Sequence, residues 1–214
     1  MDKNFPILAR EGWPFIGLTL SSLILSILFC PTLVVILFLI ITIFVVQFFR
    51  DPTRSANTNP NEVTSAADGR VIAIEKTRDP FNNRDSLKIS VFMNVFNVHS
   101  NKAPISGKVT QKIYKPGSFF NAALEKASSE NELCAITIKT HDKKIITSVQ
   151  IAGLIARRIL CYCKIGDSVI TGDKYGFIRF GSRVDLFMPN NFYALVAIGD
   201  KVKGGLTKIA IKND

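Results

Sequence analysis

A run of 36 residues without a charged side chain, residues 14–49, constrains the fold of this chain most strongly. As a single straight helix, the run would extend roughly 54 Å, well beyond the ~30 Å hydrocarbon core of a bilayer. Two helices of 17 or 18 residues would each span about 26 Å and fit that core. Because Cys30 and Pro31 lie near the middle of the run, we expect a membrane helical hairpin, or a pair of re-entrant helices, that turns there.

Two other interpretations of the run are weaker. A signal peptide has a shorter apolar region and a small-residue cleavage site after it, and neither feature is present here. A fully buried helix of a soluble protein is the remaining alternative.

The positive charge of the chain is unevenly placed. Asp2, Lys3, Arg10 and Glu11 cancel, so the net charge of +10 falls entirely within residues 50–214. A basic domain tied to a bilayer predicts contact with anionic lipid head groups, at roughly 1 kcal/mol for each nearby Lys or Arg. A nucleic-acid partner is not expected, because the sequence has no clustered basic helix, zinc-finger spacing or RNP-like aromatic motif.

The flanks of the apolar run predict its orientation. A hairpin leaves both flanks on one side of the membrane, and these flanks carry Lys3, Arg10, Arg50 and Arg54. The positive-inside rule then places the main domain on the cytoplasmic side of the cell (inner) membrane.

The four cysteines show no disulfide framework. Cys161 and Cys163 would share one face of a strand, as two reduced core cysteines. A zinc site is only weakly indicated, because the chain has two histidines and no second cysteine pair at ligand spacing. We therefore expect no metal.

From residue 50 onward the pattern is mostly β. Residues 86–100 begin with apolar side chains at every second position, and later runs are rich in β-branched residues. Residues 121–133 form a polar interruption, helical or looped, and residues 57–69 read as a linker into the first strand.

Two segments, residues 164–178 and 197–211, share a layout of strand, Gly-Asp turn and strand that resembles barrel-sandwich proteins such as biotinyl and lipoyl carriers. The lysine signature of those carriers is absent. We therefore predict a β-rich (α+β) fold. A barrel-sandwich-like catalytic domain, residues 50–214, would follow an N-terminal segment and membrane hairpin, residues 1–49.

The stretch GFIRFGSRVDLFMP, residues 176–189, alternates like a strand but is interrupted by Gly181-Ser182 between Arg179 and Arg183. A glycine in a strand often marks a β-bulge. The alternative is that the Gly181–Ser182 peptide bond is itself the site of chemistry.

Five short sequence motifs favour the second alternative, chemistry at the Gly181–Ser182 bond. In order they are FFRDPTR (48–54), ADG (67–69), NVFNVHSNKAPISGKV (94–109), YKPGSFFNA (114–122) and RFGSRVDLFMP (179–189). Together they resemble the phosphatidylserine decarboxylase family in its short, membrane-anchored form, over nearly the whole chain from residue 48.

The resemblance implies a proenzyme that cleaves itself between Gly181 and Ser182 into chains of residues 1–181 and 182–214. Ser182 would attack the preceding carbonyl and become a covalent pyruvoyl group, in place of pyridoxal phosphate and without a metal. The pyruvoyl group would form a Schiff base with phosphatidylserine and release phosphatidylethanolamine. The matching general base is His99, oriented by Asp68, whereas His141 lies in a polar turn.

The resemblance leaves other roles open. Arg179 and Arg183 would bind the substrate phosphate or face solvent, and Tyr114 would line a substrate pocket or belong only to a turn. The long form of the family has a second histidine where this chain has Phe96, and Leu-Gly-Ser-Thr where this chain has Phe-Gly-Ser-Arg. The proton donor for decarboxylation is therefore unassigned.

Two rival functions remain. A non-enzymatic, membrane-tethered barrel-sandwich adaptor or carrier would stay as one intact chain. A decarboxylase of another serine phospholipid would use the same head-group chemistry. The oligomeric state is open, a homo-oligomer included.

Overall fold

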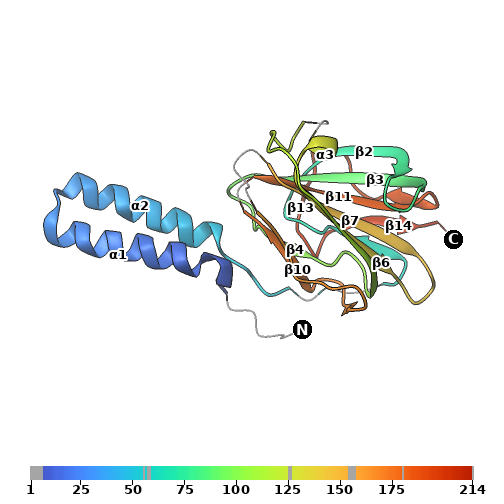
Figure 1. Cartoon of the computed structure of the whole chain (residues 1–214), viewed down its shortest axis with the longest axis horizontal. Coiled ribbons are helices and arrows are strands. Elements are labelled where there is room, and N and C mark those ends of the chain that lie inside the picture. The colour runs from blue at the N-terminus through green and yellow to red at the C-terminus, as the bar shows by residue number, and fades with distance from the viewer. Residues whose placement is uncertain are drawn as a thin grey trace. The chain divides into compact units, whose positions relative to one another are not determined.

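A computed structural model describes residues 7–54, 56, 59–124, 127–153, 158–179 and 181–213 (Figure 1). The chain divides into two compact units, Met1–Thr53 and Arg54–Asp214, which are described separately.

The first unit is a helical hairpin. A short 3-10 turn, η1 (Arg10–Gly12), leads into α1 (Trp13–Phe29), and α2 (Thr32–Phe48) returns alongside it (Figure 1). Pro31 is extended and caps the start of α2, because its ring favours the first turn of a helix and cannot continue a preceding one. The predicted turn at Cys30–Pro31 is therefore confirmed.

The hairpin is apolar on its outside and carries polar groups within. Leu18, Phe29 and Leu33 are 67%, 79% and 78% exposed, whereas Ser26 and Thr42 are buried. The two buried hydroxyls donate to helix carbonyls, at 2.8 Å in each case. Small polar residues inside and large apolar residues outside are typical of helices that pack in lipid.

The length of the helices bears on the membrane prediction. The helical stretch Arg10–Phe29 has 20 residues and is long and apolar enough to cross a bilayer. The second helix is apolar but has 17 residues, at the lower end of the range for a span. The burial expected of a soluble core helix is not seen, since 11% of the first apolar window is buried.

The second unit confirms the predicted β-rich class. Every ladder between its described strands is antiparallel. The largest sheet is curled and has eight strands, in the order β13 (Lys201–Val202), β2 (Gly69–Asp79), β3 (Arg84–Met93), β11 (Ser182–Pro189), β7 (Ile145–Ile151), β6 (Leu133–Lys139), β5 (Gly107–Lys115) and β9 (Ser168–Val169).

Two three-stranded sheets complete the unit. Their orders are β1 (Glu62–Thr64), β14 (Lys208–Lys212), β12 (Phe192–Ala194), and β4 (Ser100–Lys102), β10 (Lys174–Ile178), β8 (Ile159–Cys161). A single-turn helix, α3 (Ala127–Glu130), lies in the predicted polar interruption.

The central strand β11 is buried on both faces. Val184, Leu186 and Met188 point into the larger apolar core, and Phe187 points into a smaller cluster on the opposite side. Burial on both faces explains why this strand reads as almost continuously apolar after Asp185.

One predicted strand is shorter than expected. The pattern over residues 86–100 predicts a longer strand, but β3 ends at Met93. The Asn94 side chain accepts a hydrogen bond from the Phe96 amide at 2.9 Å, and the Asn97 side chain accepts one from the Asn94 amide at 2.9 Å. Asparagine side chains that bind nearby amides favour turns over strands, and this pair ends β3.

A buried carboxylate holds the hairpin between β2 and β3. Asp79 is fully buried and accepts hydrogen bonds from the Phe81 amide at 2.9 Å, the Asn82 side-chain amide at 3.0 Å and the Thr147 hydroxyl at 2.9 Å. It therefore joins the hairpin to β7.

Replacing Asp79 tests this network. Asp79→Ala should lower the free energy of unfolding by about 2–4 kcal/mol, because it leaves buried donors without an acceptor. Denaturant titration of the detergent-solubilised protein measures the change. The control is Asp85→Ala, which removes an exposed carboxylate from the same hairpin. Equal losses in both variants would contradict the role of Asp79.

Candidate active site

The Gly181–Ser182 bond lies where the chain passes from one sheet to another. β10 ends at Ile178 in a three-stranded sheet, and β11 begins at Ser182 in the eight-stranded sheet. Gly181 has φ +58°, which glycine adopts without the steric cost that a side chain would bring. The β-bulge interpretation is therefore wrong, because the interruption is a crossover between sheets. Phe180 lies outside the described residues.

The carbonyl of Gly181 is approached closely by Gly153. A Cβ on Gly153 would overlap the Gly181 carbonyl oxygen and would lie 3.3 Å from the Ala122 Cβ. Gly153 must therefore be glycine for this crossover to keep its position. The sequence gives no sign of this role, since a glycine after a strand reads as an ordinary turn.

The Ser182 hydroxyl is enclosed. Ser182 is fully buried, and its Oγ donates to the Met93 Sδ at 3.4 Å. The Asn101 side-chain amide lies 3.8 Å from the same sulfur, and its oxygen accepts from the Gln150 amide at 2.7 Å. A thioether is a weak acceptor, so this contact leaves the hydroxyl proton available to a stronger base.

His99 is also fully buried. Its Nδ1 lies 2.9 Å from the Asn97 carbonyl oxygen. A neutral imidazole that donates from Nδ1 carries its lone pair on Nε2 and can act as a base there. The His99 carbonyl accepts from the Ile178 amide at 3.2 Å, which places this residue beside the strand that leads into Ser182.

Asp68 binds Arg54 and the Gly204 amide. Arg54 binds both carboxylate oxygens, one of them at 2.8 Å, and the Gly204 amide donates to Oδ1 at 2.8 Å. The sequence predicted that Asp68 orients His99. In the structure the Asn97 carbonyl contacts the His99 Nδ1, and Arg54, from the string FFRDPTR, holds the Asp68 carboxylate.

The backbone nevertheless brings the predicted residues to one end of the fold. The Thr64 amide donates to the Pro104 carbonyl at 2.9 Å, and the Lys102 amide donates to the Ala66 carbonyl at 2.8 Å. The segments 64–66 and 102–104 therefore run antiparallel. Continued in the same register, they bring the backbone of Asp68 close to that of His99. The pairing of Ser182 with Met93 adds the third residue to this end.

Arg183 lies on the face of β11 opposite to Ser182. Its guanidinium forms a buried two-point ion pair with Asp185, at 2.8 and 3.1 Å. It also donates to the carbonyls of Ala122 and Leu124, at 3.1 and 3.0 Å. The guanidinium is therefore bound by protein groups, and it holds the loop at residues 122–124.

The other two predicted substrate-binding residues lie elsewhere. Arg179 is half-buried in the crossover between β10 and β11. Tyr114 is 58% exposed on β5, opposite Cys134 of β6. The structure thus places Arg179 near Ser182 along the chain and Tyr114 on a different strand of the sheet.

The Lys112 ammonium donates to the carbonyls of Cys161 and Cys163 at 2.9 Å each, and both cysteines are free thiols. A hydrogen bond from Cys134 lowers the pKa of Cys161 to about 7, and burial raises the pKa of Cys163 to about 12. Among the residues that the structure describes, no three His, Cys, Asp or Glu side chains gather as a metal site requires.

The two neighbouring thiols should therefore differ in reactivity. Iodoacetamide modifies thiolates, so Cys161, whose pKa is lowered, should be alkylated faster at neutral pH than an ordinary thiol. Cys163 should stay unmodified there, because its pKa is about 12. Peptide mass mapping after short pulses at several pH values separates the sites. Equal rates at both cysteines in the folded protein would contradict this assignment, and denatured protein provides the control.

Comparison with known proteins shows the family of this chain. A family model described as phosphatidylserine decarboxylase matches residues 41–210. The chain is 52% identical to the phosphatidylserine decarboxylase proenzyme of Ralstonia nicotianae, covering 96% of this chain and 95% of the relative. It is also 53% identical to the proenzyme of Ralstonia pickettii, with the same coverage, and 52% identical to that of Paraburkholderia xenovorans, covering 98% and 99%. The chain belongs to the phosphatidylserine decarboxylase family.

Proposed function

We propose that this chain is a proenzyme that cleaves itself between Gly181 and Ser182 and then decarboxylates phosphatidylserine to phosphatidylethanolamine. The observation that carries the proposal is the buried Ser182 hydroxyl after a left-handed glycine. It occurs in a chain about half identical, over nearly its whole length, to proenzymes named for this reaction.

Self-cleavage would begin with Ser182. Its Oγ forms a bond with the Gly181 carbonyl carbon, the peptide C–N bond breaks, and the freed nitrogen takes up a proton. His99 would accept the hydroxyl proton at Nε2, since a serine hydroxyl needs a base to become nucleophilic. Loss of the Ser182 α-proton then breaks the Cβ–O bond, which releases the Gly181 carboxylate. Water converts the resulting dehydroalanine to a pyruvoyl group and ammonia.

The residues around Ser182 fit such a group. Gly153 leaves room beside the Gly181 carbonyl, and Met93 lies against the Ser182 side chain without a strong polar contact. The ketone of a pyruvoyl group would accept the amino group of the serine head group and withdraw electrons as carbon dioxide leaves. The proposal needs neither pyridoxal phosphate nor a metal.

The remaining site residues take proposed roles that follow from their positions. Asp68, held by Arg54 and the Gly204 amide, would orient His99. Arg179, in the crossover, would contact the substrate phosphate. Arg183 would position the Ala122–Leu124 loop rather than bind lipid directly. Tyr114 would contact substrate only from a more distant strand.

The helical hairpin would hold the catalytic unit at the lipid substrate. Its apolar exterior and the flanking arginines support a location in the inner membrane, with residues 54–214 on the cytoplasmic side. A non-enzymatic adaptor would also use such an anchor, but it gives no reason for the buried crossover at Ser182.

Intact-mass measurement of the purified chain tests the proposal. The parent should give two fragments, residues 1–181 and 182–214, and the smaller one should resist Edman degradation and react with a hydrazine. Ser182→Ala should remain one chain, because it lacks the nucleophile. The matched control is Ser90→Ala, which removes a second buried hydroxyl, one with no hydrogen-bond partner among the residues that the structure describes.

A further variant tests the geometry of the crossover. Gly153→Ala should slow cleavage, since its Cβ would displace the Gly181 carbonyl. An uncleaved parent chain from active membranes would overturn the proposed function. Normal cleavage of Ser182→Ala would instead show that the wrong bond has been assigned.

A further inference from the structure

We propose that the end of the eight-stranded sheet at which β11 begins is the surface that contacts an anionic phospholipid bilayer. The inference deepens the proposed function and rests on it for the lipid substrate. We define the surface by a basic cluster, Arg70, Lys201 and Lys203, and by two apolar tips, Phe96 and Ile198.

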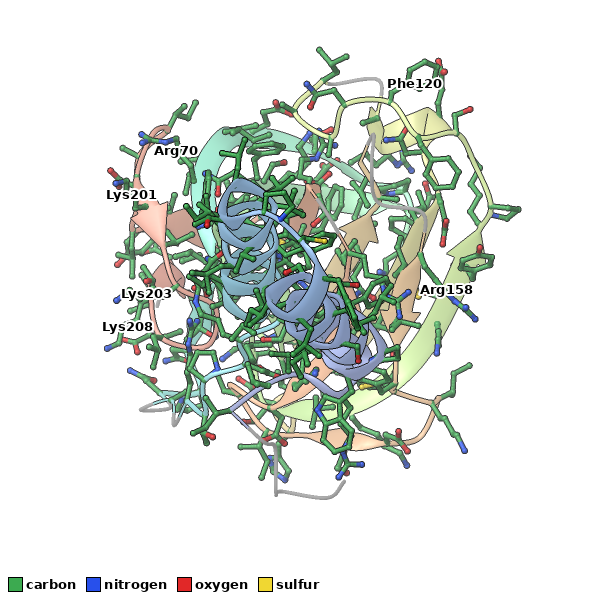
Figure 2. All side chains as sticks on the ribbon, turned by 90° about the vertical axis from the view of Figure 1, so that its left-hand side faces the viewer. Arg70, Phe120, Arg158, Lys201, Lys203 and Lys208 are labelled. Carbon is green, nitrogen blue, oxygen red and sulfur yellow. The ribbon has the colours of Figure 1, made fainter. Side chains whose placement is uncertain are left out.

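Strand pairing holds the basic cluster together. Lys201 of β13 pairs directly with Arg70 of β2, and Lys203 directly follows β13. All three side chains are exposed. Figure 2 shows Arg70, Lys201, Lys203 and Lys208 on one side of the unit, whereas Arg158 lies on the opposite side.

The cluster keeps a surplus of positive charge. Lys208 lies nearby, but its ammonium is 2.9 and 2.8 Å from the two carboxylate oxygens of Glu62, so that pair is neutral. Asp200 is the acidic residue next to Lys201, and its carboxylate accepts the Ala197 amide at 2.8 Å. Three cations therefore face one carboxylate, which favours an anionic partner.

The apolar tips are held on turns of fixed geometry. Ile198 is 64% exposed. It lies in a turn whose Gly199 amide donates a hydrogen bond to the Val71 carbonyl at 2.8 Å. Phe96 is 64% exposed in the asparagine-rich turn that ends β3. Single exposed apolar residues are common, but exposed apolar tips beside a basic cluster are typical of surfaces that enter the lipid interface.

The surface adjoins the proposed cleavage site. Arg70 pairs with Phe92, and Phe92 pairs with Arg183, so the three residues lie in one row across β2, β3 and β11. Two strand spacings place Arg70 roughly 10 Å from Arg183 along this row. Ser182 is the next residue and points to the opposite face, so the surface and the Gly181–Ser182 bond share one end of the sheet.

Tryptophan quenching by lipid tests this contact on the full chain. In a Trp13→Phe background, which removes the only tryptophan, Ile198→Trp places a probe at one tip. Ile165→Trp is the matched control, because Ile165 is 65% exposed in the corresponding Gly-Asp turn, near β9 at the opposite edge of the sheet. The vesicles contain phosphatidylethanolamine and phosphatidylglycerol with brominated acyl chains.

Emission from Trp at position 198 should be quenched, whereas emission at position 165 should not. Replacing phosphatidylglycerol with phosphatidylcholine should weaken the quenching. Neutralising one cation should lower the equilibrium constant for contact between this surface and the bilayer by about fivefold. The three variants that test this are Arg70→Gln, Lys201→Gln and Lys203→Gln. Absent quenching at position 198, equal quenching at both positions, or insensitivity to the three neutral variants would overturn the proposal.

Two further measurements keep the result interpretable. Circular dichroism reports whether each variant folds, and Phe96→Trp gives a second probe on the same surface if Ile198→Trp does not fold. Repeating the quenching in the Ser182→Ala background needs no self-cleavage and no decarboxylation. A failure of the proposed function would therefore leave this readout intact, and a failure of the membrane surface would leave the mass measurement intact.

Discussion

The pairing of β11 between β3 and β7 is the constraint on which the rest of the site depends. These two ladders fix the start of β11 against Met93 on one side and Ile151 on the other. The chain enters β11 from a different sheet, and Gly181, just before the first paired residue, takes the left-handed conformation that this crossover uses. The two ladders thus fix the position of Ser182 at the start of β11.

The sequence predicted the parts of the fold that local chemistry determines. Pro31 within an uncharged run predicted the turn between two helices, and alternating apolar residues predicted the strands. The end of β3 was not predicted, because the apolar pattern continues beyond Met93. The side chains of Asn94 and Asn97 accept hydrogen bonds from nearby amides and form a turn there.

The site was predictable only in part, because its contacts join residues far apart in the chain. Ser182 and His99 could be named from their strings, but the approach of Gly153 to the crossover depends on sheet register. The Arg183–Asp185 pair had a usable signal, since residues two apart in a strand share a face. That Arg54 would bind the Asp68 carboxylate has no signal in local spacing.

The central claim is that residue 182 becomes a carbonyl that captures the lipid amine. Incubating the purified chain with phosphatidylserine vesicles and sodium cyanoborohydride, followed by mass analysis of both fragments, tests it directly. We expect fragment 182–214 to gain the lipid, fragment 1–181 to gain none, and Ser182→Ala to stay unmodified. Two results would contradict this claim. One is lipid bound to fragment 1–181, and the other is no bound lipid on either fragment of a preparation that decarboxylates phosphatidylserine.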